Sequence, residues 1–330
     1  MNAVIDRFAR AGRHLAPGRR TSARGWWGLA SGTSGTFAAR VAPLADGTLQ
    51  LGALRELSAP GQQHARRAAD VAAVLTNPRA PCAMLMPEDD YKLMLMPGLP
   101  VTADERTEAL RWQLKDELEC PPDDAVIDCV VAPVETPGME HGLWTVVMAR
   151  RRLVFELVEP LTRTGAPIEA VDVAELAQRN LARRSCEPGR PVALLTLDAR
   201  RGLLTLTRDD CMYAARRFDP LAAGLAEAAD DVPRQSSLTE RLALELQRTF
   251  DNVERHYGVG PVDEVIVLAE HGGTALVDGL STLLPVQVRP FELALLCSAA
   301  DPALIQRAAS KVAACHAIGA ALRAADEASA

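Results

Sequence analysis

Two runs of short β-strands, far apart in the chain, constrain the fold more than any other feature of the sequence. The first covers residues 26–57, where small-residue turns break an apolar run and Asp46-Gly47 marks a hairpin. The second covers residues 192–216, with a turn at 198–202. Helical sequence follows each run. We therefore predict a duplicated α/β architecture, in which one backbone turn from each half faces a shared cleft.

The length and composition of the chain agree with two packed halves. With 330 residues it exceeds the size of roughly 250–300 residues at which a single core stops growing. The net charge of −7 argues against a general attraction to nucleic acid. Aromatic residues make up only 4% of the chain, and no basic stripe interleaves with them. We expect no nucleic-acid partner.

The cysteines and the hydropathy predict a cytoplasmic protein. The seven cysteines are odd in number, form no Cys-x-x-Cys pair and mostly lie in apolar runs, which favours reduced thiols over disulfides or a zinc site. No segment approaches the ~18 consecutive apolar residues of a membrane span. The N-terminus also lacks the apolar core of a secretory signal. We expect no transmembrane segment.

Residues 1–24 differ from the rest of the chain in charge. They carry about +5, which leaves about −12 for the remainder, and their basic residues are Arg7, Arg10, Arg13, Arg19, Arg20 and Arg24. Their composition predicts a flexible tail. The alternative is contact with anionic lipid, since each basic residue near such a surface gains about 1 kcal/mol.

Residues 91–148 read as strand, helix, strand and strand, which predicts a small inserted subdomain. Its helix is predicted from a capping box at Thr102 and Glu105 to the stop at Pro121-Pro122. We therefore assign residues 25–90 and 149–188 to the first half and 189–330 to the second. Other helices are predicted at 64–75, 153–164 and 173–181, from a second capping box at 237–240 to residue 257, and from 301 to about 325.

Three turns carry candidate binding residues. Gly32, Thr33, Ser34 and Gly35 could present N–H groups and hydroxyls to a phosphate, although a simple tight turn is the alternative. Asp198 could hold a Mg²⁺ ion through water, or only shape its own turn. A third turn stands between a strand and a helix, where an anion or an adenine could lie, or where glycine merely relieves the junction. This turn is Glu270-His271-Gly272-Gly273-Thr274, and its candidate binding residues are Gly272 and Gly273.

No catalytic residues can be assigned from the sequence. There is no Gly-x-Ser-x-Gly elbow, and the six histidines are dispersed without metal-ligand spacing. Cys315-His316 lies inside a run of small residues, which predicts core packing rather than chemistry.

Three stretches together resemble a known family. Residues 108–118 (EALRWQLKDEL) with 121–128 (PPDDAVID) are similar to the inserted-subdomain signature of the MSHA pilus biogenesis protein MshI. MshI is a relative of the type IV pilus protein PilM and, more distantly, of the cell-division protein FtsA. Residues 242–251 and 313–323 resemble two later helices of that group. The three stretches occur in the family's order, and the resemblance spans roughly residues 25–325.

This resemblance implies an actin-like fold: two RNase H-like halves around a cleft for ATP or ADP with Mg²⁺, plus a small inserted α+β subdomain. The sequence departs from the family's motifs at several points. Ala30 stands where the first turn usually has an acid, and Arg200 replaces a glycine after Asp198. Losing the acid removes a partner for the metal that neutralises phosphate charge, whereas Arg200 could pair with a phosphate oxygen. Hydrolysis of a nucleotide is therefore not expected. The sequence is compatible with a cleft that binds a nucleotide and with a cleft that binds none.

The resemblance implies a cytoplasmic scaffold of a MSHA-like or type IV pilus assembly platform. The implied partner is a bitopic, PilN-like inner-membrane protein, docked near the cleft between the inserted subdomain and the first half. A homo-oligomer is compatible with the sequence. One alternative is an active actin-like ATPase or phosphotransferase that uses Asp198. Another is a membrane adaptor acting through residues 1–24.

Overall fold

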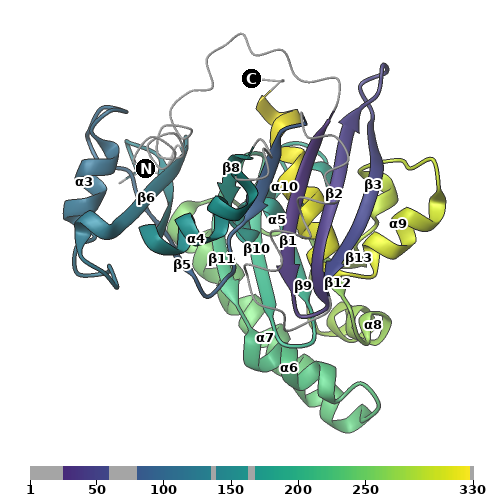
Figure 1. Ribbon diagram of the computed structural model, residues 1–330. Helices are drawn as coiled ribbons and strands as arrows, with labels where there is room; N and C mark the ends of the chain where they lie inside the picture. The colour runs from purple at the N-terminus through teal and green to yellow at the C-terminus, as the bar shows by residue number, and fades with distance from the viewer. Residues whose placement is uncertain (1–24, 59–79, 135–138, 163–167, 328–330) are drawn as a thin grey trace.

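The computed structural model describes residues 25–58, 80–134, 139–162 and 168–327 (Figure 1). The predicted basic tail at 1–24 and the predicted helix at 64–75 lie outside these ranges. Among the described residues, no helix combines the length and the apolar content needed to cross a bilayer.

Two five-stranded sheets have the same strand order, which confirms the predicted duplication. In each, the first three strands form an antiparallel meander, and two later strands add in parallel beside the first of them. The first sheet has the order β3-β2-β1-β4-β8, and the second β11-β10-β9-β12-β13. The strands of the first are β1 (Trp26–Gly32), β2 (Gly35–Pro43), β3 (Leu49–Ser58), β4 (Cys82–Leu85) and β8 (Ile168–Asp172). Those of the second are β9 (Val192–Leu197), β10 (Gly202–Arg208), β11 (Cys211–Arg217), β12 (Glu264–Ala269) and β13 (Gln287–Pro290).

A third, antiparallel sheet with the order β5-β7-β6 forms an insertion between β4 and β8. Its strands are β5 (Tyr91–Pro97), β6 (Ala125–Ala132) and β7 (Leu143–Arg150), and helix α3 (Arg106–Gln113) lies at the outer side of the molecule (Figure 1). Leu110 and Leu114 pack with Trp144 in the core of this unit. The apolar spacing that predicted the helix therefore does face a core.

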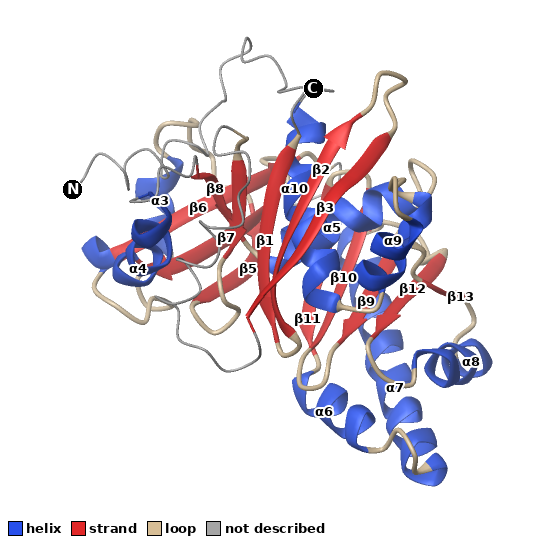
Figure 2. Ribbon diagram, turned by 45° about the vertical axis from the view of Figure 1, so that its right-hand side comes forward, coloured by secondary structure: helices blue, strands red, loops and turns tan. Residues whose placement is uncertain are grey.

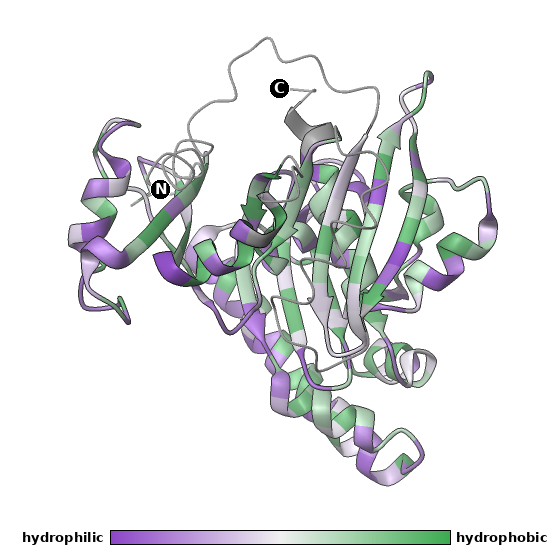
Figure 3. Ribbon diagram, viewed as in Figure 1, coloured by the Kyte–Doolittle hydropathy of each residue, from purple (hydrophilic) through white to green (hydrophobic). Residues whose placement is uncertain are grey.

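Two helices lie between the two large sheets and hold the halves together (Figure 2). These are α5 (Ala174–Ser185), which packs on β9 and β10, and α10 (Val312–Glu327), which packs on β1 and β2. Helix α10 lies close to β1 because Gly28 of β1 has no side chain: a Cβ added there would lie 1.8 Å from the carbonyl oxygen of Ala317 in α10. Figure 3 shows apolar residues, drawn green, in the strands on both sides of these helices, whereas α7 at the lower edge carries many hydrophilic residues, drawn purple.

The outer helices differ from the predictions at their ends. Thr102 does bond to Glu105, yet α3 begins only at Arg106. The remaining helices are α4 (Arg151–Thr162), α6 (Asp219–Glu227), α7 (Val232–Tyr257), α8 (Gly273–Leu283) and α9 (Pro302–Ala309). The second capping-box prediction is wrong, because α7 starts earlier, where Asp231 accepts from the N–H of Arg234. The prediction of a single final helix is also wrong. Helix α9 ends at Ala309, and a separate helix, α10, starts at Val312, whose N–H donates to Glu270.

Candidate functional site

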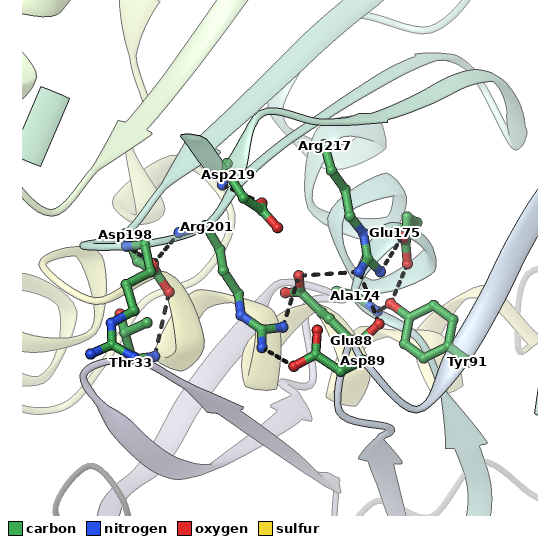
Figure 4. Close-up of polar contacts among 12 residues, drawn as sticks. Thr33, Glu88, Asp89, Tyr91, Ala174, Glu175, Asp198, Arg201, Arg217 and Asp219 are labelled. Carbon is green, nitrogen blue, oxygen red and sulfur yellow. Dashed lines mark hydrogen bonds and ion pairs between the residues drawn. The ribbon is translucent and has the colours of Figure 1, made fainter. Parts of the chain in front are cut away.

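The turns of the two halves face each other, as the duplication predicts. Thr33 and Ser34 form the tip between β1 and β2, and Asp198 follows β9 at the corresponding end of the second sheet. The backbone N–H of Thr33 donates to Oδ2 of Asp198 at 3.4 Å (Figure 4). A Cβ added at Gly32 would lie 2.9 Å from the Cβ of Ala313 and 3.6 Å from Asp198 Oδ2. The first turn is thus in direct contact with the second.

Asp198 shapes its own turn. Its Oδ1 accepts from the N–H groups of Arg200 at 2.8 Å and Arg201 at 2.7 Å, and its side chain is buried. Aspartate commonly binds the backbone two residues on in this way. Both carboxylate oxygens therefore already accept hydrogen bonds. The side chain of Arg200 is exposed.

Glu270 lies in the third predicted turn but was not named there as a binding residue, and it supplies a second carboxylate at the first turn. It directly follows β12, so it stands at the same edge of the sheet as Asp198. Its Oε1 accepts from the hydroxyl of Ser34 at 3.0 Å and from the N–H of Val312 at 2.8 Å, and its Oε2 lies 3.9 Å from Nζ of Lys311. The position at the end of a buried parallel strand was the signal that could have identified it.

Gly272 and Gly273 begin helix α8, as the sequence predicts. Gly272 has a left-handed backbone, with φ +60°, and its carbonyl accepts from Leu276. The cavity between this turn and Asp198 measures only about 10 Å³. That is about the volume that a single water molecule requires.

At these turns, the groups that could bind a phosphate already contact carboxylates. The N–H of Thr33, which would have to face a phosphate, faces the Asp198 carboxylate, and Glu270 adds a second negative charge at the same turn. His316 brings no compensating charge, because burial lowers its pKa to about 4 although Asp198 lies near it. Among the described residues, no group of three or more His, Cys, Asp or Glu side chains is placed to hold a metal.

A network of charged side chains joins the root of the insertion to the second half (Figure 4). Arg217 of β11 donates to Oε1 of Glu175 at 3.0 Å and to the carbonyl oxygen of Glu88 at 2.8 Å. Tyr91 donates its hydroxyl to the other oxygen of Glu175 at 2.5 Å. Arg201, in the second-half turn, contacts Glu88 at 3.3 Å.

The burial of this network shows how strongly its charges depend on one another. The side chain of Glu175 is only 3% exposed, so its charge is compensated by Arg217 rather than by water. Burial also raises the pKa of Glu88, although Arg217 and Arg201 oppose that effect. The sequence did not predict this network, because its five members come from β5, α5, β11 and two separate turns.

A pocket of about 290 Å³ lies where the insertion meets the start of α4. Four acidic and two basic side chains line it, so acids outnumber bases in its lining, although Asp89 also pairs with Arg201 outside the pocket. The acids are Asp89, Asp90, Glu117 and Glu119, the bases are Lys92 and Arg150, and Leu153 lines the α4 side.

Comparisons with known proteins support the fold. No family model matches the sequence, and no curated protein matches it significantly. Among solved structures, the chain is similar to one described as the PilM-PilN type IV pilus biogenesis complex, with a TM-score of 0.68 and 21% identity. That match covers 91% of this chain and 98% of the other.

Two further matches are more distant. One is the cytoplasmic domain of EpsL, an inner-membrane component of the type II secretion system of Vibrio cholerae, with a TM-score of 0.46 and 12% identity over 74% of this chain and 82% of that one. The other is a Bacteroides thetaiotaomicron protein with an actin-like ATPase fold, with a TM-score of 0.47 and 10% identity over 82% of this chain and 91% of that one.

The strand order, the duplicated sheets and the first of these matches agree with the fold that the sequence resemblance implied. The chain has the actin-like fold, with a small inserted α+β subdomain.

Proposed function

We propose that this protein is a cytoplasmic scaffold of a type IV pilus or MSHA-like assembly platform, and that it docks the short cytoplasmic segment of a bitopic, PilN-like inner-membrane protein. The fold similarity to a PilM-PilN complex supports this class of function. The observation that carries the proposal is the acidic pocket between the insertion and α4.

The charge of this pocket suits such a partner. Cytoplasmic segments close to a membrane span carry an excess of Lys and Arg. The pocket has two more acidic than basic side chains. The side chains of Glu119 and Asp89 are both 78% exposed, but Asp89 pairs closely with Arg201 at 2.5 Å. The ion pair of Glu119 with Arg150 is longer, at 3.6 Å. Glu119 is therefore the acid that a bound segment can engage more readily. The docked segment would then keep the scaffold at the inner membrane through its partner.

The test is binding of a synthetic peptide with the N-terminal cytoplasmic sequence of the candidate membrane protein, measured by calorimetry with and without ATP–Mg²⁺. We expect Glu119→Lys to weaken binding by about two- to fivefold, as for one exposed charge pair. Asp123→Lys is the matched control, because Asp123 is fully exposed, neighbours the same region and does not line the pocket. No binding in either nucleotide state would contradict the docking role.

The proposal also includes a cleft that no longer turns over nucleotide. The closed contact between Thr33 and Asp198, together with Glu270 at the same turn, supports this part. We expect ATP–Mg²⁺ to leave the melting temperature unchanged. Saturable ATP binding with phosphate release that Asp198→Ala abolishes would instead establish the active ATPase alternative.

A further inference from the structure

A second groove, of about 450 Å³, lies between the insertion and the second half and shares no lining residue with the acidic pocket. Strand β5 forms one wall through Leu93, Met94 and Leu95. Strand β11 forms the other through residues 213–216, and α7 contributes Arg248, Thr249 and Asn252. The groove is therefore built from two sheets and one long helix.

Both strands that line this groove are edge strands of their sheets. β5 is the edge strand of its sheet and pairs with β7, while β11 is the edge strand of its sheet and pairs with β10. Within the described residues, neither strand has a second neighbour. An edge strand offers N–H and C=O groups on alternate residues to an added strand. The groove thus has the hydrogen-bonding chemistry that an extended peptide backbone can satisfy.

The size of the groove agrees with an added strand. Strands lie about 4.8 Å apart, sheets pack about 10 Å apart and each residue advances about 3.3 Å, so one strand residue fills about 160 Å³. A volume of 450 Å³ therefore holds about three residues. This equals the length of the β5 wall, residues 93–95.

The side chains around the groove favour one kind of peptide. Leu93, Leu95 and Ala215 pack against a buried core cluster but stay partly exposed, so the surface that they leave in the groove is apolar and suits apolar side chains. Arg216 and Arg248 both pair with the single carboxylate of Glu245, which leaves an excess positive charge at the α7 end. An acidic side chain of the bound segment would supply the missing carboxylate.

We propose that this groove binds an extended, acidic peptide segment of a partner protein by strand addition to β5 or β11. The occupant differs in charge from the basic segment proposed for the acidic pocket, so the two sites do not compete for one ligand. The chain's own residues 1–24 are unsuited to the groove, because their six arginines would face Arg216 and Arg248.

The experiment measures fluorescence anisotropy with the full-length protein and three labelled synthetic peptides. The first alternates valine and threonine and has aspartate at both ends, the second replaces aspartate with lysine, and the third has alternate amides of the first N-methylated. We expect the aspartate peptide to bind, the lysine peptide to bind at least fivefold more weakly, and the N-methylated peptide not to bind. No binding of the aspartate peptide, or equal binding of either of the others, would overturn the proposal.

Two pairs of variants locate the binding to the groove. Arg248→Gln should weaken binding of the aspartate peptide about two- to fivefold, whereas Arg241→Gln, on the same helix outside the groove, should not. Asn252→Trp should fill the groove and weaken binding at least tenfold, whereas Asp251→Trp should not. Unchanged binding to Asn252→Trp would overturn the proposal. A dimer in sedimentation experiments that Asn252→Trp dissociates would assign the groove to a second copy of the chain instead.

Discussion

The buried ion pair between Arg217 and Glu175 gives the sharpest test of how the insertion is fixed to the second half. Arg217→Leu would leave the Glu175 carboxylate, whose side chain is 3% exposed, with the hydroxyl of Tyr91 as its remaining side-chain partner in the network. Removing one partner of a fully buried pair costs about 3–5 kcal/mol. Because the Arg217 side chain is 30% exposed, water screens part of this cost, and we expect a loss of about 2–3 kcal/mol.

A second substitution separates the charge from the packing. Glu175→Gln removes the charge but keeps an oxygen that can accept from Tyr91. The double variant Arg217→Leu/Glu175→Gln should therefore recover at least half of the stability that Arg217→Leu loses. Arg216→Leu, on the same strand, is the matched control, because its pair with Glu245 is more exposed and should cost less than about 1 kcal/mol.

The assay is urea unfolding followed by circular dichroism, with the free energy of unfolding compared among the four proteins. A double variant no more stable than Arg217→Leu alone would refute the reasoning, because the loss would then come from packing and not from an uncompensated charge. A loss below about 0.5 kcal/mol for Arg217→Leu would refute it as well.

Three further substitutions test separate features of the fold. Burial lowers the pKa of His316 to about 4, so below about pH 6.5 the unfolded state binds a proton that the folded state does not. The free energy of unfolding should therefore fall by up to about 3 kcal/mol between pH 6.5 and pH 4. The fall should be smaller in His316→Gln when both proteins are measured by urea unfolding. Gly28→Ala should lower the free energy of unfolding by about 3 kcal/mol or more in the same assay, because the added Cβ would overlap the carbonyl oxygen of Ala317 in α10. Gly52→Ala is the control and should lower it far less, since no neighbour lies nearer than 4.0 Å. Asp231→Ala should lower the melting temperature through a loss of about 1 kcal/mol, since it removes the cap of α7; an unchanged melting temperature would show that the cap does not stabilise the helix.

The local features of the chain were predictable because each depends on neighbouring residues. Apolar runs ended by turns of small or polar residues predicted the strands of both meanders, and the turn at Asp46-Gly47 forms as expected, with Thr48 bonded to Asp46. Helix ends were harder to predict. The start of α10 depends on Glu270, which is 42 residues away in sequence, so no local signal marks it.

The sequence by itself determined that the chain has two similar halves with an insertion between them, because strand and turn preferences are set over a few residues. Only the tertiary structure decided what the turns face. The carboxylate of Asp198 meets a backbone N–H that is 165 residues away, and Arg217 reaches a carbonyl 129 residues away. Such contacts depend on how the sheets pack around α5 and α10, and packing brings together groups whose separation along the chain carries no information about their distance in space.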